Sequence, residues 1–300
     1  MRLSLCMALL GNLSPALAPA QTPPNTRVFD SDGVQIRYVD KGSGDPVLLI
    51  HGFAGRLEFW ETTGIAAGLT AAGFRVIAYD ARGHGNSAKP HDPEQYGEED
   101  VEDAVRLLDH LSIERANVVG YSRGSKIASH LVAQHPSRLR SVVFGGWGVD
   151  NPVETLSLED CLATADSLAR GAFPVPLARA LRPSGAPPPT TEQQAVVTRQ
   201  LAAGNDLRAL AAAFRAGCEA RRVTAAALHA IGVPALAIVG ALDGMTPSVH
   251  AMAREMGGAL EVIVIPHADH YTTPVHPEFI ARVVTFLRDL RRESPQLRRQ

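Results

Sequence analysis

The stretch of sequence that decides the fold is Asn117-Val118-Val119-Gly120-Tyr121-Ser122-Arg123-Gly124-Ser125. A short β-branched run leads into a Gly-x-Ser-x-Gly motif, and residues 126–132 then carry apolar side chains at helical spacing. The predicted order is therefore strand, sharp turn and helix, with Ser122 at the apex. Glycine is needed on both sides of the motif because side chains there would collide where the strand and the helix pass. The pattern predicts a serine whose hydroxyl is held out beyond the end of a buried strand.

A reactive serine requires a base and an acid, and two later segments supply candidates for them. The apolar run 234–239 predicts a strand, and Asp243 follows its end. The apolar run 260–265 predicts another strand, and His267 and His270 lie in the loop after it. Asp243 is therefore the candidate acid and His270 the candidate base, with His267 as the rival base.

The candidates follow the chain order Ser122, Asp243, His270. This order resembles that of the α/β-hydrolase fold superfamily, in the branch that carries a helical cap. Residues 46–53 resemble the strand of that family that ends in a His-Gly-x oxyanion loop. Residues 79–87 resemble its Asp-x-Arg-Gly-His-Gly-x-Ser turn. The resemblance extends over most of the chain and is weakest in the cap.

The resemblance implies an α/β fold, namely a mostly parallel eight-stranded sheet with helices on both faces and a helical cap inserted after strand six. The expected boundaries are 27–149 and 233–292 for the α/β-hydrolase core and 150–232 for the cap. Periodicity adds an antiparallel hairpin over 28–39, a single helix over 59–72 and several helices without a strand in the cap.

The resemblance also implies roles for individual residues. Ser122 would be the nucleophile, His270 the general base, and Asp243 the acid that orients the imidazole. The backbone N–H groups of Phe53 and Arg123 would form an oxyanion hole. The side chain of Arg123 is expected to be solvated.

Five more positions follow from the same resemblance. Some relatives place the acid directly after strand six, so Asp150 stays open as the alternative acid. His51 and His84 lie in glycine-flanked turns and are expected to hydrogen-bond the backbone. Asp269 stands where the family usually has a small residue, and Ser125 stands where it commonly has glycine, but neither departure removes a catalytic atom.

A serine nucleophile argues against haloalkane dehalogenase and epoxide hydrolase chemistry, because both need an alkylatable carboxylate. Acyl transfer to water remains, and the first expectation is a carboxylesterase-like hydrolase for esters of small to medium acyl groups. An enol-lactonase or C–C bond hydrolase is the alternative, and a non-catalytic ligand-binding protein is the remote one. Trp147 is expected to line the substrate pocket. The cap offers four further apolar candidates, although for most of them packing within the core of the cap is the preferred interpretation: Phe173, Leu177, Leu181 and Phe214.

Composition narrows the range of partners. The 300-residue chain has a net charge of −2, which gives no electrostatic footprint for nucleic acid. No uninterrupted apolar stretch reaches the length of a membrane span. No cofactor is implied, and no metal is expected because His267 and His270 lack a third ligand nearby. The expected partner is a small-molecule ester substrate, while the oligomeric state is left undetermined.

Residues 1–20 resemble a signal peptide, with one basic residue, an apolar run and Ala18-Pro19-Ala20 at the cleavage spacing. This pattern predicts a periplasmic or secreted protein, and the alternative is a cytoplasmic enzyme with an N-terminal arm. Export would leave Cys161 and Cys218, both in the cap, as an even pair in an oxidising compartment. The sequence leaves open whether they form a disulfide or remain buried thiols.

Overall fold

The computed structural model describes residues 26–183, 186–218 and 220–297. The predicted signal peptide, residues 1–20, lies outside this part of the chain. Across the described ranges, no helix is both long enough and apolar enough to cross a membrane.

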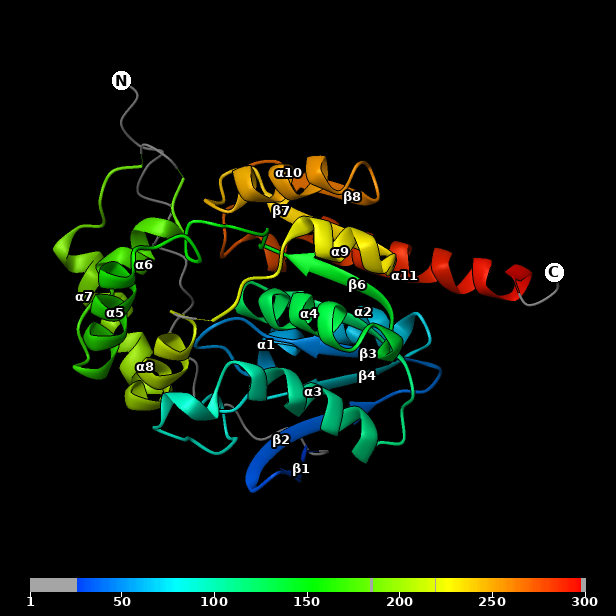
Figure 1. The fold of residues 1–300 in the computed structure, drawn as a ribbon, viewed down its shortest axis with the longest axis horizontal. Coiled ribbons are helices and arrows are strands. Elements are labelled where there is room, and N and C mark those ends of the chain that lie inside the picture. Colours follow the sequence, from blue (N-terminus) through cyan, green and yellow to red (C-terminus); the bar gives the residue numbers. More distant parts are fainter. Residues whose placement is uncertain (1–25, 184–185, 219, 298–300) are drawn as a thin grey trace.

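One eight-stranded sheet forms the centre of the molecule (Figure 1). Its strands are β1 (Thr26–Ser31), β2 (Val34–Lys41), β3 (Asp45–Ile50), β4 (Phe74–Tyr79), β5 (Ala116–Tyr121), β6 (Leu139–Gly145), β7 (Ala235–Gly240) and β8 (Leu260–Ile265). They are ordered β1-β2-β4-β3-β5-β6-β7-β8 across the sheet. β2 pairs antiparallel with both of its neighbours, and the other pairs are parallel. This arrangement confirms the predicted fold class and the predicted N-terminal hairpin.

Some of the helices cover both faces of this sheet and others form a cap beyond it. They are α1 (Glu58–Thr62), α2 (Ile65–Ala71), α3 (Glu98–His110), α4 (Arg123–Gln134), α5 (Leu158–Ala169), α6 (Val175–Ala180), α7 (Thr191–Gly204), α8 (Leu207–Ala216), α9 (Ala225–Ile231), α10 (Thr246–Glu255) and α11 (Pro277–Leu297). Short 3₁₀ turns are η1 (Pro93–Gln95), η2 (Pro136–Arg138) and η3 (Thr273–Val275). Along β3, Leu48 and Ile50 pack in one hydrophobic cluster with α3 and α4, while Leu49 packs in a second with α2 and α11. Because alternate residues of a strand point to opposite faces, both faces of β3 are buried.

Two elements differ from the sequence prediction. The single helix expected over 59–72 is divided into α1 and α2, because Gly64 between them adopts a left-handed backbone with φ of 80°. The second element is α9, which lies inside the range expected for the cap. Ala225 and Leu228 of α9 are buried in the same hydrophobic cluster as α4, so this helix belongs with the core.

The remaining helices of the insertion, α5 to α8, form the cap. Figure 1 shows them grouped beyond the ends of the strands to which the arrows point, which are the carboxyl ends. Cys161 of α5 and Cys218, just after α8, form a disulfide with their Cα atoms 5.7 Å apart. The sequence left open whether these two cysteines form a disulfide, and in the structure they do.

Removing this disulfide by the double substitution of Cys161 and Cys218 to alanine is expected to lower the free energy of unfolding by up to about 4 kcal/mol. The reason is that the bridge closes a separation of 57 residues in the unfolded chain. Urea unfolding with and without a reducing agent measures the effect, and the double variant should not respond to the reductant. Thiol titration of denatured, unreduced protein should detect neither cysteine, and two free thiols would contradict the bridge.

Candidate active site

Ser122 forms the turn between β5 and α4, with φ of 53° and ψ of −117°. A residue other than glycine rarely adopts a positive φ, because its Cβ crowds the backbone, so this conformation is strained. The flanking glycines allow close passage of the strand and the helix. A Cβ on Gly120 would lie 2.5 Å from Gly124 O, and a Cβ on Gly124 would lie 1.9 Å from Ile50 O. Local packing therefore accounts for the Gly-x-Ser-x-Gly motif.

Gly124→Ala is expected to destabilise the protein by about 3 kcal/mol, because the new methyl group would overlap the backbone of Ile50. Helix propensity alone predicts the opposite sign, since alanine is favoured over glycine in a helix by about 1 kcal/mol. Gly68→Ala in α2 is the matched control, because its methyl group would meet the side chains of Ile280 and Val284 rather than backbone. Urea unfolding compares the two variants, and equal stabilities would contradict the packing argument.

Three side chains from separate segments form one hydrogen-bonded chain. His270 Nε2 lies 2.9 Å from Ser122 Oγ, and His270 Nδ1 lies 2.8 Å from Asp243 Oδ2. The His270 side chain is 6% exposed and that of Asp243 is fully buried. Because an ionised carboxylate can only accept hydrogen bonds, we assign the imidazole proton to Nδ1, which leaves Nε2 to accept from the Ser122 hydroxyl.

Other hydrogen bonds hold Asp243 and the loop of His270 in place. Met245 N donates to Asp243 Oδ1 at 2.9 Å, and the Tyr121 hydroxyl donates to the carbonyl oxygen of His270 at 2.6 Å. Asp269, one of the two departures from the family pattern, accepts hydrogen bonds from two backbone N–H groups of the loop that carries His270. Its side chain therefore shapes the loop.

The rival acid and the rival base lie elsewhere. His267 is exposed, and Asp150 is 65% exposed and accepts a hydrogen bond from Arg222 at 3.0 Å. The residues that the structure brings to Ser122 are therefore His270 and Asp243. Within the described ranges, no group of three or more His, Cys, Asp or Glu side chains is placed to hold a metal ion.

The loop after β3 lies directly beside Ser122, since a Cβ on Gly52 would be 3.3 Å from Ser122 Cβ. The backbone N–H groups of Phe53 in this loop and of Arg123, the first residue of α4, meet no acceptor in the part of the chain that the structure describes. An N–H group in the first turn of a helix has no partner within the helix. Both groups are therefore free to donate a hydrogen bond to a bound oxygen.

Two buried histidines support this region. His51 Nδ1 lies 2.8 Å from Gly52 O, and the N–H of Ala81 donates to His51 Nε2 at 3.1 Å. His84 Nδ1 lies 2.9 Å from Arg82 O. Burial lowers the pKa of His51, and lowers the pKa of His84 well below its usual value, so both rings stay neutral. Both histidines hydrogen-bond the backbone, as the sequence predicted.

A cavity of about 1860 Å³ is lined by Ser122, His270 and residues of the cap. The structure places Trp147 in its wall, together with the four predicted apolar cap residues: Phe173, Leu177, Leu181 and Phe214. The ring of Phe214 packs edge-on against that of Phe53, with centroids 5.6 Å apart. This contact connects the cap with the loop after β3.

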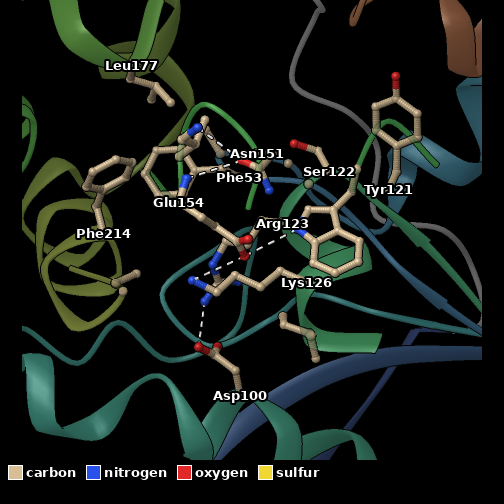
Figure 2. A pocket seen from close by; sticks show the side chains of 18 of the residues that line it. Phe53, Asp100, Tyr121, Ser122, Arg123, Lys126, Asn151, Glu154, Leu177 and Phe214 are labelled. Carbon is tan, nitrogen blue, oxygen red and sulfur yellow. Dashed lines mark hydrogen bonds and ion pairs between the residues drawn. The ribbon is translucent and has the colours of Figure 1, made fainter. Parts of the chain in front are cut away.

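Two ion pairs that were not predicted from the sequence lie in the cavity wall (Figure 2). Arg123 lies 2.6 Å from Asp100, and its side chain is 14% exposed, so the expectation that it is solvated was wrong. Lys126 Nζ lies 3.8 Å from Glu154 Oε1, which also accepts a hydrogen bond from Trp147 Nε1 at 3.4 Å. Burial lowers the pKa of Lys126 and raises that of Glu154.

The sequence contained a partial signal for these pairs. Arg123 and Lys126 are three residues apart at the start of the helix after Ser122, and residues at that spacing share one face of a helix. Their acidic partners come from α3 and from the segment after β6, so pairing them required the tertiary structure.

Comparison with known proteins agrees with this architecture. Residues 45–277 match the family described as alpha/beta hydrolase fold. The 2-hydroxymuconate semialdehyde hydrolase of Pseudomonas sp. (strain CF600) is 36% identical over 137 residues, or 45% of this chain and 48% of that protein. The dihydrolipoyllysine-residue acetyltransferase component of the acetoin cleaving system of Pseudomonas putida is 30% identical over 263 residues, or 82% of this chain and 65% of that protein. The chain thus spans less than two thirds of these relatives.

Among solved structures, a carboxylesterase structure from Nitrososphaera gargenis has a TM-score of 0.69 and 24% identity. The superposition covers 89% of this chain and 99% of that chain. At this identity the likeness concerns the fold. The family match over residues 45–277, the order of the strands and the likeness in fold agree with one another. The chain belongs to the α/β-hydrolase fold family.

Proposed function

We propose that the protein is a serine hydrolase that cleaves carboxylic esters of small to medium acyl groups. The observation that carries this proposal is the hydrogen-bonded chain from Ser122 through His270 to Asp243, at the wall of a cavity with apolar cap residues. A serine hydroxyl is a poor nucleophile at neutral pH, and a neutral imidazole backed by a carboxylate is the arrangement that activates it.

In the proposed reaction, Ser122 Oγ attacks the ester carbonyl carbon while His270 Nε2 takes the hydroxyl proton. Asp243 stabilises the imidazolium that forms. The negative charge that develops on the substrate oxygen would be met by the N–H groups of Phe53 and Arg123, each worth roughly 3 kcal/mol of the barrier. The imidazolium then protonates the departing alcohol, and water, activated by the same imidazole, releases the acid from Ser122.

A second candidate is an enol-lactonase or a C–C bond hydrolase that uses the same three residues. It is favoured by the sequence similarity to the 2-hydroxymuconate semialdehyde hydrolase of Pseudomonas sp. (strain CF600). That similarity covers 45% of this chain, so it ranks below the ester proposal.

A panel of p-nitrophenyl esters of increasing acyl length, run beside lactones and 2-hydroxymuconate semialdehyde, tests these candidates. We expect turnover of the shorter esters to exceed that of the other compounds. Turnover of the semialdehyde or a lactone without ester cleavage would favour the second candidate. If no compound is turned over and a fluorophosphonate leaves Ser122 unlabelled, the protein is a non-catalytic ligand-binding member of the family.

We also propose that the protein is exported and that residues 1–20 are removed as a signal peptide. Disulfides persist chiefly in oxidising compartments, so the Cys161–Cys218 bridge supports export. N-terminal sequencing of protein made in an exporting host tests the proposal. An intact Met1 in the periplasmic or secreted fraction would contradict it.

A further inference from the structure

The wall of the cavity at α4 carries two ion pairs, whereas the cap contributes several apolar side chains together with polar ones. Figure 2 shows Arg123, Lys126 and Glu154 together in this wall, with Asp100 paired to Arg123. The proposed ester hydrolysis assigns no role to the side chains of these residues. Ion pairs inside a cavity are costly to desolvate, so a stabilising role alone does not account for them.

All four members of the two ion pairs line the cavity, but the cation of each pair is the more exposed. The Lys126 side chain is 24% exposed against 6% for Glu154, and the Arg123 side chain is 14% exposed against 4% for Asp100. A molecule in the cavity can therefore contact the cations, although the two pairs are neutral overall.

Lys126 is the less satisfied of the two cations. Its ammonium lies 3.8 Å from Glu154, which is beyond hydrogen-bond distance, and it has no hydrogen-bond acceptor among the described residues. Arg123 is hydrogen-bonded to Asp100 at 2.6 Å through Nη2, while its buried Nη1 has no partner among the described residues. An ammonium has three donors, so Lys126 can bind an anionic group without first breaking a hydrogen bond within the protein.

Lys126 lies about one helical turn from Ser122. Ser122 is the cap residue before α4 and Lys126 follows it by four residues, which corresponds to about 6 Å between the two backbones along the helix axis. An acyl chain of a few carbons spans that distance. We propose that Lys126 binds a carboxylate at the far end of the acyl chain, so that the preferred substrates are half-esters of short dicarboxylic acids. This inference rests on the proposed ester hydrolysis.

Hydrolysis of monomethyl glutarate and of methyl glutaramate tests the inference, because the two esters share a shape and differ in charge. We expect kcat/KM to be roughly 10- to 100-fold higher for the half-ester, which corresponds to one charge-assisted interaction. Lys126→Met should reduce this ratio to about one, and Lys126→Arg should retain a preference for the anion, because only the arginine keeps the charge. Glu154→Gln is the matched control, because it changes the acid that pairs with Lys126. In this variant the ratio of kcat/KM for the half-ester to that for the amide should stay at or above the ratio of the unmodified protein.

Equal kcat/KM for the two esters in the unmodified protein would overturn the inference and leave the ester proposal standing. So would a ratio that Lys126→Met leaves unchanged. If neither ester is cleaved, the ester proposal fails, and calorimetry decides the subsite separately. Monomethyl glutarate should bind Ser122→Ala at least tenfold more tightly than it binds the same variant carrying Lys126→Met, and equal binding would overturn the inference.

Discussion

Ser122→Ala is expected to lower kcat for ester hydrolysis by roughly 10⁴- to 10⁶-fold with the fold retained. The substitution removes the atom that would form the acyl bond. It leaves unchanged the two glycines that allow β5 and α4 to pass closely. Steady-state kinetics on a p-nitrophenyl ester measures the loss, and circular dichroism checks the fold.

Ser125→Ala is the matched control for this experiment. Ser125 lies three residues after Ser122, in the first turn of α4, and its buried hydroxyl donates to Gly145 O at 3.0 Å. Losing that hydrogen bond should cost about 1 kcal/mol of stability and little turnover. A fluorophosphonate should label Ser125→Ala and the unmodified protein, but not Ser122→Ala. Full activity in a folded Ser122→Ala protein would refute the proposed nucleophile.

His270→Ala is expected to be as damaging as the serine substitution, because the three residues act as one unit and their effects are not additive. His267→Ala is the matched control and should cost little, since His267 is exposed. Kinetics of both variants on the same ester decides between the two histidines. If His267→Ala were the more damaging, the base would have to be reassigned.

Asp243→Asn should lower kcat by roughly 10⁴-fold, because an amide no longer stabilises the imidazolium and can favour the wrong tautomer of His270. Asp150→Asn should have a small effect, since it removes one exposed ion pair with Arg222. The ratio of the two effects is the informative quantity. A milder effect for Asp243→Asn than for Asp150→Asn would transfer the acid role to Asp150.

Local features of the architecture could be derived from sequence because their causes are local. The run before Ser122 and the helical spacing after it predicted β5 and α4, and the steric need for Gly120 and Gly124 is confirmed by the close approach of the two elements. Period-two and helical patterns depend on neighbours a few residues apart. The break at Gly64 was missed because a glycine inside an apolar helical pattern is compatible with either a continuous or a divided helix.

The sequence by itself determined which segments form the strands, the serine turn and the short set of acids and histidines near the sheet edge. Only the tertiary structure decided that His270 and not His267 faces Ser122, and that Lys126 and Glu154 meet in the cavity wall. The same holds for the position of α9, which is helical by local pattern but joins the core through contacts with α4. Such choices depend on residues far apart in the chain, and periodicity carries no information about which distant side chains burial brings together.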